Sequence, residues 1–496
     1  MRLPPLVPCF LLCFLPALTA QEMPDHPAPA KLGEVHFPVS CKSAVQPEFN
    51  RAVALLHSFA YSAAATAFRE VSAQDPQCAM AHWGVAMTFY RQLWEPAILP
   101  GSDAEPRQEI SQGLRLRTAS AREEKFLKAA ALVFADAASV PYRTRAASYE
   151  RAMADLAAEY PKDDEVQVFY ALALLANASP ADKAHARQKQ AAGILEPLLR
   201  SNPQHPGVPH YLIHAYDNAE MAQKGLAAAR LYSKVAPSAP HALHMPSHIF
   251  TRLGLWQDSI AANLAARDAA HRDGDTGEEL HAMDYLVYAY LQSGRDREAI
   301  AVAEQAKALA PPASADLKVG YASTAMPIRC LVERGQWADA ALITPPKDAP
   351  PHVVAIAIWA RGIGLARSSR AEEARKPMED LQAIESSLQA AGNDYWATQV
   401  RVMRREVAAW TAQASHKEPE AVALLRQASD EEDALEKLPV TPGPIIPARE
   451  QLGDLLLQQG QPSLAAKEFQ AALILAPGRR GALEGAKKAA ALQLAR

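Results

Sequence analysis

Histidines gather in one short stretch of this 496-residue chain. Five of the 15 histidines fall within residues 210–248. Four of them form pairs at a spacing of four residues, His210 with His214 and His244 with His248. Side chains at this spacing share one face of a helix and stand about 5–6 Å apart at Cβ. The second pair repeats the first after 34 residues, position for position.

Paired imidazoles can do three kinds of chemistry. Neutral rings ligate copper or zinc, protonated rings bind anions, and rings that exchange a proton act in acid–base catalysis. Paired histidines on facing helices are the arrangement that a metal site in a helix bundle uses. The alternative is that these histidines only bond to carbonyls or pack at helix starts, as the sequence HMPSH at 244–248 would.

The composition favours helices. Hydrophobic residues make up 49% and aromatic residues 7%, with few glycines, which is unlike a large β-protein. The 38 prolines predict many short helices with frequent stops. A net charge of −4 argues against a nucleic-acid or anionic-membrane partner. The sequence contains no glycine-rich phosphate loop, nucleophile elbow or HExxH motif.

A repeat stands out near the carboxyl end. Residues 447–477 read PAREQLGDLLLQQGQPSLAAKEFQAALILAP, which resembles the tetratricopeptide repeat, a 34-residue pair of antiparallel helices. Weaker copies cover most of residues 45–490. The resemblance implies an all-α fold, a tetratricopeptide-like α-solenoid in which antiparallel helix pairs form a superhelix. The positions that carry the match are Leu452, Gly453, Gly460, Ala465, Phe469, Ala472 and Pro477.

Within the family's framework, the two histidine pairs occupy equivalent places on neighbouring first helices. The resemblance implies that these places line the concave groove, so the four rings are expected in one cavity. We predict a metal site formed by His210, His214, His244 and His248, with no cofactor other than copper or zinc. The pattern departs from the family at Gly225, Pro246 and Ser247, which fits a specialised region or inert, strained helices. The other residues predicted to bind a ligand in the groove are Asp217, Asn218, His241, Arg252, His281, Asp284 and Tyr288.

The amino terminus predicts export. Residues 1–20, MRLPPLVPCFLLCFLPALTA, resemble a cleavable secretory signal, and no later stretch predicts a membrane span. The chain is thus similar to exported bacterial tetratricopeptide-repeat proteins, which are periplasmic or secreted. The predicted divisions are a signal at 1–20, a proline-rich tether at 21–44, helical repeats at 45–203 with a loop near 99–112, a histidine-rich repeat region at 204–311, helical pairs with proline-rich loops at 312–446, and a final repeat with an end-capping helix at 447–496.

Loops and exposed faces are predicted beside these repeats. Residues 344–351 and 439–447 are proline-rich and predict ordered, extended links. The charged runs at 404–410 and 430–437 predict solvated helix faces. Cys41, Cys78 and Cys330 remain after the signal is removed. They predict either a Cys41–Cys78 disulfide with one spare thiol or three buried free thiols.

Three functions follow from these patterns. The first is an exported scaffold, not an enzyme, whose concave groove binds a partner protein, a peptide or another ligand. The second is a protein that binds or handles copper or zinc through the paired histidines. The third is a histidine-based hydrolase, which ranks last because no nucleophile lies beside the histidines in the sequence.

Overall fold

A computed structural model describes residues 30–94, 97–98, 101–116, 120–135, 137, 139–309, 314 and 316–495. The chain divides into two compact units, Met1–Ala30 and Lys31–Arg496. The predicted signal at 1–20 and residues 21–29 of the predicted tether lie outside the described residues. All elements assigned in the described ranges are helices, in the second unit.

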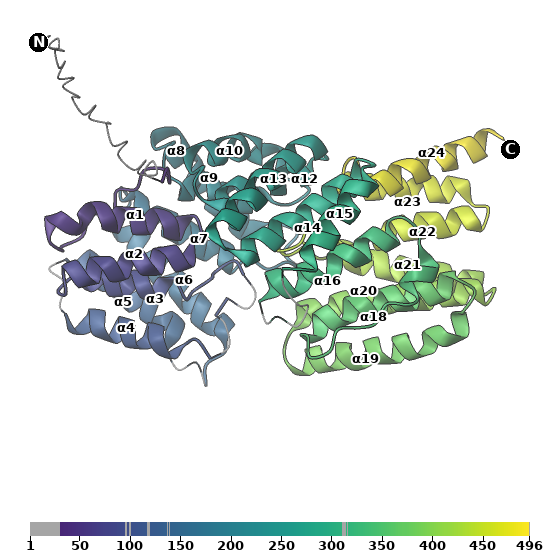
Figure 1. The fold of residues 1–496 in the computed structure, drawn as a ribbon, viewed down its shortest axis with the longest axis horizontal. Helices are drawn as coiled ribbons and strands as arrows, with labels where there is room; N and C mark the ends of the chain where they lie inside the picture. The colour runs from purple at the N-terminus through teal and green to yellow at the C-terminus, as the bar shows by residue number, and fades with distance from the viewer. Residues whose placement is uncertain are drawn as a thin grey trace, which may run out of the picture. The chain divides into compact units, whose positions relative to one another are not determined.

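The all-α solenoid predicted from the sequence is confirmed. Each helix packs against its neighbours in the chain, and in several places helices two apart also touch (Figure 1). Two further contacts join distant segments, α1 with α9 and α14 with α24. Among the described helices, none is both long and apolar enough to cross a bilayer.

The helices of the first half are short and are separated by turns. They are η1 (Ser43–Val45), α1 (Gln46–His57), α2 (Tyr61–Gln74), α3 (Ala79–Met87), α4 (Ala104–Arg115), α5 (Ala121–Phe134), α6 (Tyr142–Glu159), α7 (Asp164–Ala176), α8 (Ala186–Ser201), α9 (Gly207–Tyr216), α10 (Ala222–Val235), α11 (Pro240–His244) and α12 (Pro246–Arg252).

The second half continues the array with longer helices. They are α13 (Trp256–Asp273), α14 (Thr276–Gln292), α15 (Asp296–Ala306), α16 (Leu317–Val332), α17 (Trp337–Ala340), α18 (Pro351–Arg367), η2 (Ala371–Ala374), α19 (Arg375–Ala390), α20 (Asp394–Ala414), α21 (Glu418–Asp433), α22 (Ala448–Gln458), α23 (Pro462–Leu475) and α24 (Arg480–Leu494).

Glycines let the helices approach closely where the repeat pattern places an aromatic ring. A Cβ on Gly453 would lie 2.7 Å from the Phe469 ring, and one on Gly485 in the next helix would lie 2.3 Å from it. Phe68 and Gly84 repeat this arrangement near the amino end, at 2.3 Å. Real side chains do not make contacts this short, so the ring replaces the missing side chains as the filler between helices.

Two predictions about irregular segments are wrong. Residues 104–112 are not a loop but most of α4. Pro106 lies in the first turn, where a missing N–H costs nothing, and it is buried with Ile110 and Gly113 on one face. The described part of the predicted tether is not free either, because Phe37 is buried among the rings of Phe49, Trp83 and Phe126.

A disulfide links the amino-terminal arm, the described residues before Ser43, to the helical array. Cys41 and Cys78 are bonded, and Cys330 is a buried free thiol. Cys78 directly precedes α3, so the bond ties the arm to the start of that helix. Of the two alternatives in the sequence, the structure has the disulfide with one spare thiol.

The disulfide is expected to stabilise the first helices. It spans 37 residues, and closing such a loop in the unfolded chain is worth about 3–4 kcal/mol. A Cys41→Ser/Cys78→Ser variant should therefore lose about that much protection against amide hydrogen exchange in α1 and α3. The wild type in dithiothreitol is the matched control and should exchange like the variant. Unchanged exchange in both would contradict the prediction.

Candidate metal centre

Six histidines of the central helices come together in two groups of three. Trio A is His210 and His214 of α9 with His241 of α11, and trio B is His244 of α11 and His248 of α12 with His281 of α14. Within each trio, the ligand atoms of all three side chains lie within 4.8 Å of one another. Each four-residue pair therefore takes its third member from the next first helix of the array.

This grouping refines the sequence prediction. The two pairs do lie side by side, with the ring centres of His214 and His248 5.9 Å apart. The prediction of one site with four histidine ligands does not match the grouping, because His241 and His281 complete two separate trios.

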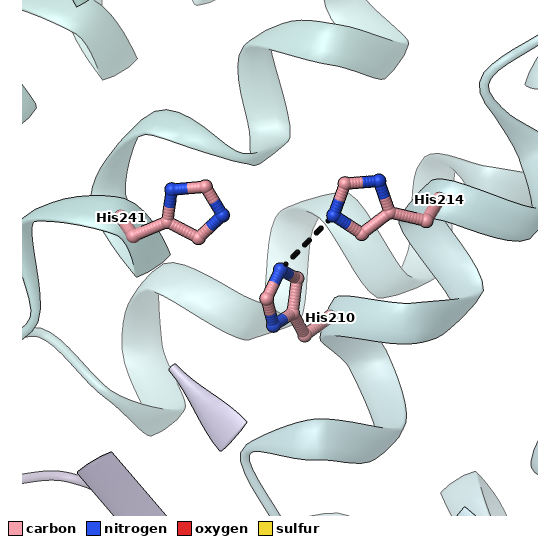
Figure 2. Close-up of side chains that lie close together, drawn as sticks. All are labelled: His210, His214 and His241. Atoms are coloured by element: carbon pink, nitrogen blue, oxygen red, sulfur yellow. Dashed lines mark hydrogen bonds between the residues drawn. The ribbon is translucent and has the colours of Figure 1, made fainter. Parts of the chain in front are cut away.

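In trio A, whose three rings are drawn in Figure 2, two rings are oriented by hydrogen bonds and two ring nitrogens have no partner among the described residues. The Nδ1–H of His210 donates to the carbonyl oxygen of His57 at 2.6 Å, which leaves a lone pair on its Nε2. That Nε2 lies 3.2 Å from Nε2 of His214. His241 Nδ1–H donates to Glu278 at 2.9 Å. Nε2 of His241 and Nδ1 of His214 are buried, with no hydrogen-bond partner among the described residues.

In trio B, hydrogen bonds orient two rings and fix their tautomers. The Nδ1–H of His244 donates to Oδ1 of Asn263 at 2.7 Å, and the Nδ1–H of His248 donates to Oδ2 of Asp217 at 2.9 Å. The amide of Asn263 is oriented because its Nδ2 donates to the carbonyl oxygen of Ser259. A carboxylate only accepts, so the tautomer of His248 is fixed as well.

The two Nε2 atoms of trio B face each other at 3.0 Å. Since both rings carry their proton on Nδ1, both of these nitrogens have a lone pair, and neither can donate to the other. Two facing lone pairs repel unless a cation lies between them. A tetrahedral zinc ion with Zn–N bonds of about 2.0–2.1 Å would hold two such nitrogens about 3.3 Å apart. Nε2 of His281 is buried nearby and, among the described residues, has no hydrogen-bond partner.

Burial favours the neutral form of five of these six rings. It lowers the pKa of His210, His214, His244 and His281 well below the usual value, and neighbouring imidazoles lower it further. Burial also brings the pKa of His248 to about 4, although the hydrogen bond to Asp217 opposes the shift. A neutral imidazole is a metal ligand, whereas anion binding requires a charged ring. Among the three uses of paired imidazoles, the lowered pKa values thus favour metal binding over anion binding.

Asp217 connects the histidines to a buried ion network. Its Oδ1 accepts from Nε of Arg252 at 2.8 Å, and its Oδ2 accepts from Nζ of Lys437 at 2.8 Å as well as from His248. Burial alone would raise the pKa of Asp217, but Lys437 and Arg252 outweigh it and hold the pKa well below the usual value. The carboxylate is therefore charged beside trio B.

The other predicted groove residues have different roles. Asn218 caps the turn before α10, since its Oδ1 accepts from the backbone N–H of Met221 at 2.9 Å. Asp284 is buried 3.8 Å from Arg329, and burial raises the pKa of Asp284 to about 6. The hydroxyl of Tyr288 is 3.3 Å from Nη1 of Arg479. These contacts hold the array together and do not reach the histidines.

The concave face at these residues is not an open groove. Tyr285 donates its hydroxyl to the carbonyls of Pro439 or Thr441, both at 2.9 Å, and Arg329 donates to the carbonyl of Pro444 at 3.0 Å. The segment 434–447 thus covers the inner side of α14. A peptide that entered here would have to displace this segment.

The prediction that both charged runs are solvated is wrong. In the first run, Glu406 is buried and accepts from the indole N–H of Trp359 at 2.6 Å. In the second, Lys437 pairs with Asp217, and Glu432 accepts from the backbone N–H of Ala448 at 2.8 Å. Hydrogen-bonded or ion-paired carboxyl and amino groups can be buried, which a run of charged letters does not reveal.

A third cluster of similar residues is satisfied without an ion. His57 Nε2–H and His205 Nε2–H donate to the two oxygens of Glu165, both at 3.0 Å. The remaining nitrogens accept, from the hydroxyl of Tyr211 at 2.9 Å and from the N–H of Gly207 at 3.1 Å. No ring nitrogen in this cluster is left over, so it serves the packing of α1 against α7 and α9.

Sequence reasoning missed the residues that orient the trios. Glu278, Asn263 and Tyr285 come from α13 and α14, and His57 comes from α1. Glu278 lies three residues before His281, so a search for carboxylates on the same helix face would have found it. No local signal identifies His57, because its carbonyl reaches His210 across 153 residues of chain.

Comparisons with known proteins give distant likenesses only. No protein-family model matches the chain, and no curated protein matches it in sequence. Among solved structures, a human IFIT1 dimer with m7Gppp-AAAA is 11% identical over 84% of this chain and 90% of that one, with a TM-score of 0.38. The Cut9–Hcn1 hetero-tetramer of the APC/C is 12% identical over 90% and 76%, with a TM-score of 0.37. The P58(IPK) TPR domain is 12% identical over 91% and 99%, with a TM-score of 0.22. At these TM-scores, none of the likenesses carries an argument about function.

The Glu165 cluster predicts a graded loss of stability. Glu165→Ala would leave two buried imidazole N–H groups without acceptors, so we expect the free energy of unfolding to fall by about 3–5 kcal/mol. Glu165→Gln should cost roughly 1–2 kcal/mol, because His57 can change tautomer and donate to the Tyr211 hydroxyl instead. Urea unfolding of the two variants measures the difference. Equal losses would contradict this account of the cluster.

Proposed function

We propose that this helical-repeat protein binds two transition-metal ions, copper or zinc, one at each histidine trio. The observation that carries the proposal is the 3.0 Å contact between two imidazole nitrogens in trio B whose rings are both protonated elsewhere. A shared proton would relieve the contact only as an imidazolium, and burial opposes that charge. A metal ion supplies the missing positive charge.

The surroundings of the two trios match each other in a way that supports the proposal. In each trio, one ring donates its Nδ1–H to a carboxylate, His241 to Glu278 in trio A and His248 to Asp217 in trio B. A second ring donates to a neutral acceptor, the carbonyl of His57 or the amide oxygen of Asn263. Metal-bound histidines have such outer partners, which fix the tautomer and increase the basicity of the ring.

Donor chemistry supports copper or zinc over harder ions. The ligand atoms of both trios are imidazole nitrogens, and imidazole suits zinc and copper, whereas magnesium and calcium require oxygen. The two carboxylates balance the charge of the ions from the outer positions. Affinity for nitrogen sites rises toward Cu²⁺ in the divalent series, so copper is expected to displace zinc at equal concentration.

We further propose that the protein is exported. The leader at residues 1–20 supports this, as does the Cys41–Cys78 disulfide, because such bonds persist mainly in oxidising compartments.

Metal stoichiometry tests the main proposal. Protein purified without a histidine tag, stripped with a chelator and titrated with Zn²⁺ or Cu²⁺ should bind two equivalents. His210→Gln and His244→Gln should each remove one equivalent, and the double variant should remove both, because each substitution breaks one trio. The count is made by mass spectrometry after gel filtration, with circular dichroism as a check of folding.

His36→Ala is the matched control for that titration, because His36 is exposed and far from the trios in sequence. It should retain two equivalents. Folded wild-type protein that retains no zinc or copper after gel filtration would overturn the proposal.

The outer carboxylates predict a selective loss of affinity. Asp217→Asn should weaken the ion at trio B and Glu278→Gln the ion at trio A, each about 10–100-fold, because the ligand ring loses its orienting acceptor. Competition with a chromophoric chelator measures the two constants. The His210→Gln background keeps only trio B. In this background, Asp217→Asn should weaken metal binding, and Glu278→Gln should leave it unchanged. An equal effect of both substitutions in that background would contradict the assignment of the carboxylates.

A further inference from the structure

A cavity lies against trio A. It has a volume of about 800 Å³, and its wall includes the segment after α3, residues of α6 to α8, the end of α9, Tyr395 and residues 436–440. His214 and Asp217 form part of its wall. This volume falls within the range of small-molecule sites, which is about 300–1,000 Å³.

His214 is the member of the six histidines that faces this cavity. It is half-buried, while the other five are buried, and it is the one of the six in the cavity wall. The indole of Trp94 also lines the cavity, and its centre lies 5.8 Å from that of His241 and 5.3 Å from that of His281. An ion held by trio A would therefore have one side toward the cavity.

Trio B is covered on the corresponding side. The Tyr285 ring lies 4.8 Å from His244 and 4.8 Å from His248, between centres. Its hydroxyl is held by the carbonyls of Pro439 and Thr441. The two trios, alike in their ligands, thus differ in access.

We propose that the ion at trio A keeps one coordination position open to this cavity and binds a small organic ligand there, whereas the ion at trio B is closed. This inference rests on the proposed function. Three histidine ligands and a fourth position for water or substrate are the arrangement of zinc sites that exchange ligands, and closed sites are structural.

The cavity wall indicates what kind of ligand would fit. Trp94, Leu93 and Leu438 give an apolar surface for an aromatic or alkyl body. Oε1 of Gln188 is buried without a hydrogen-bond partner in the described part of the chain and would accept from an N–H or O–H group. The predicted ligand is a compact aromatic or alkyl compound with a nitrogen or oxygen donor for the ion.

Single-site variants loaded with Co²⁺ test this inference. His244→Gln leaves trio A, and His210→Gln leaves trio B. The probes are imidazole and 4-phenylimidazole, and their binding is monitored by the visible ligand-field spectrum of cobalt. In His244→Gln we expect both probes to shift the spectrum, with 4-phenylimidazole binding at least tenfold more tightly because its phenyl group enters the cavity. In His210→Gln we expect no shift.

A second experiment tests the cavity by filling it with a larger side chain. Ala178 lines the cavity, so Ala178→Trp in the His244→Gln background should weaken 4-phenylimidazole at least tenfold and leave Co²⁺ bound. Ala184→Trp is the matched control, because Ala184 is exposed outside the cavity wall. It should leave the affinity unchanged.

The outcomes separate the two proposals. If His244→Gln binds Co²⁺ but neither probe shifts its spectrum, or if both single-site variants respond equally, the open position at trio A is overturned and metal binding stands. If neither folded variant holds Co²⁺, both proposals are overturned together.

Discussion

Two imidazole nitrogens that cannot bond to each other, Nε2 of His244 and Nε2 of His248, lie 3.0 Å apart in trio B. Their tautomers are fixed by Asn263 and Asp217, and these acceptors are in turn fixed by Ser259, Arg252 and Lys437. Such an arrangement costs free energy unless a cation occupies it. Nearly every polar contact around trio B would therefore serve as outer support for the ion that we propose.

The repeat explains why the arrangement occurs twice. A 34-residue period places the pair His244–His248 in the position that His210–His214 occupies one unit earlier. The next first helix then supplies the third ring. The period does not supply the acceptors, which differ in kind: a backbone carbonyl of α1 orients trio A, while a side-chain amide of α13 orients trio B. One scaffold thus gives two sites with similar ligands and different access.

The sequence predicted what local spacing controls. It placed the histidine pairs on equivalent helices, and it placed Gly453 and Phe469 at fixed positions of the repeat, because helical period and repeat period are both written in the residue order. It could not predict contacts between residues that are far apart in the chain. The carbonyl of His57 lies 153 residues before His210 in the chain, and the side chain of Lys437 lies 220 residues after Asp217. Only the curvature of the array brings each of them to its partner. His241 and His281, which were predicted to bind a ligand in the groove, lie beside the four histidines of the predicted metal site.

The segment 434–447 determines which chemistry the histidines can do. In an open groove these rings would be hydrated and would titrate near the ordinary histidine pKa of about 6.5, which suits a proton switch or an anion site. Burial brings the pKa of His248 to about 4, and the charge of Lys437, which belongs to this segment, contributes to the shift. The same segment brings Lys437 to Asp217 and keeps that carboxylate charged. Buried ion pairs of this kind add little net stability, because desolvation offsets their attraction. Neutral imidazoles next to a charged carboxylate suit the metal ion that we propose, so the covering segment would then act as part of the metal centre although none of its atoms is a ligand.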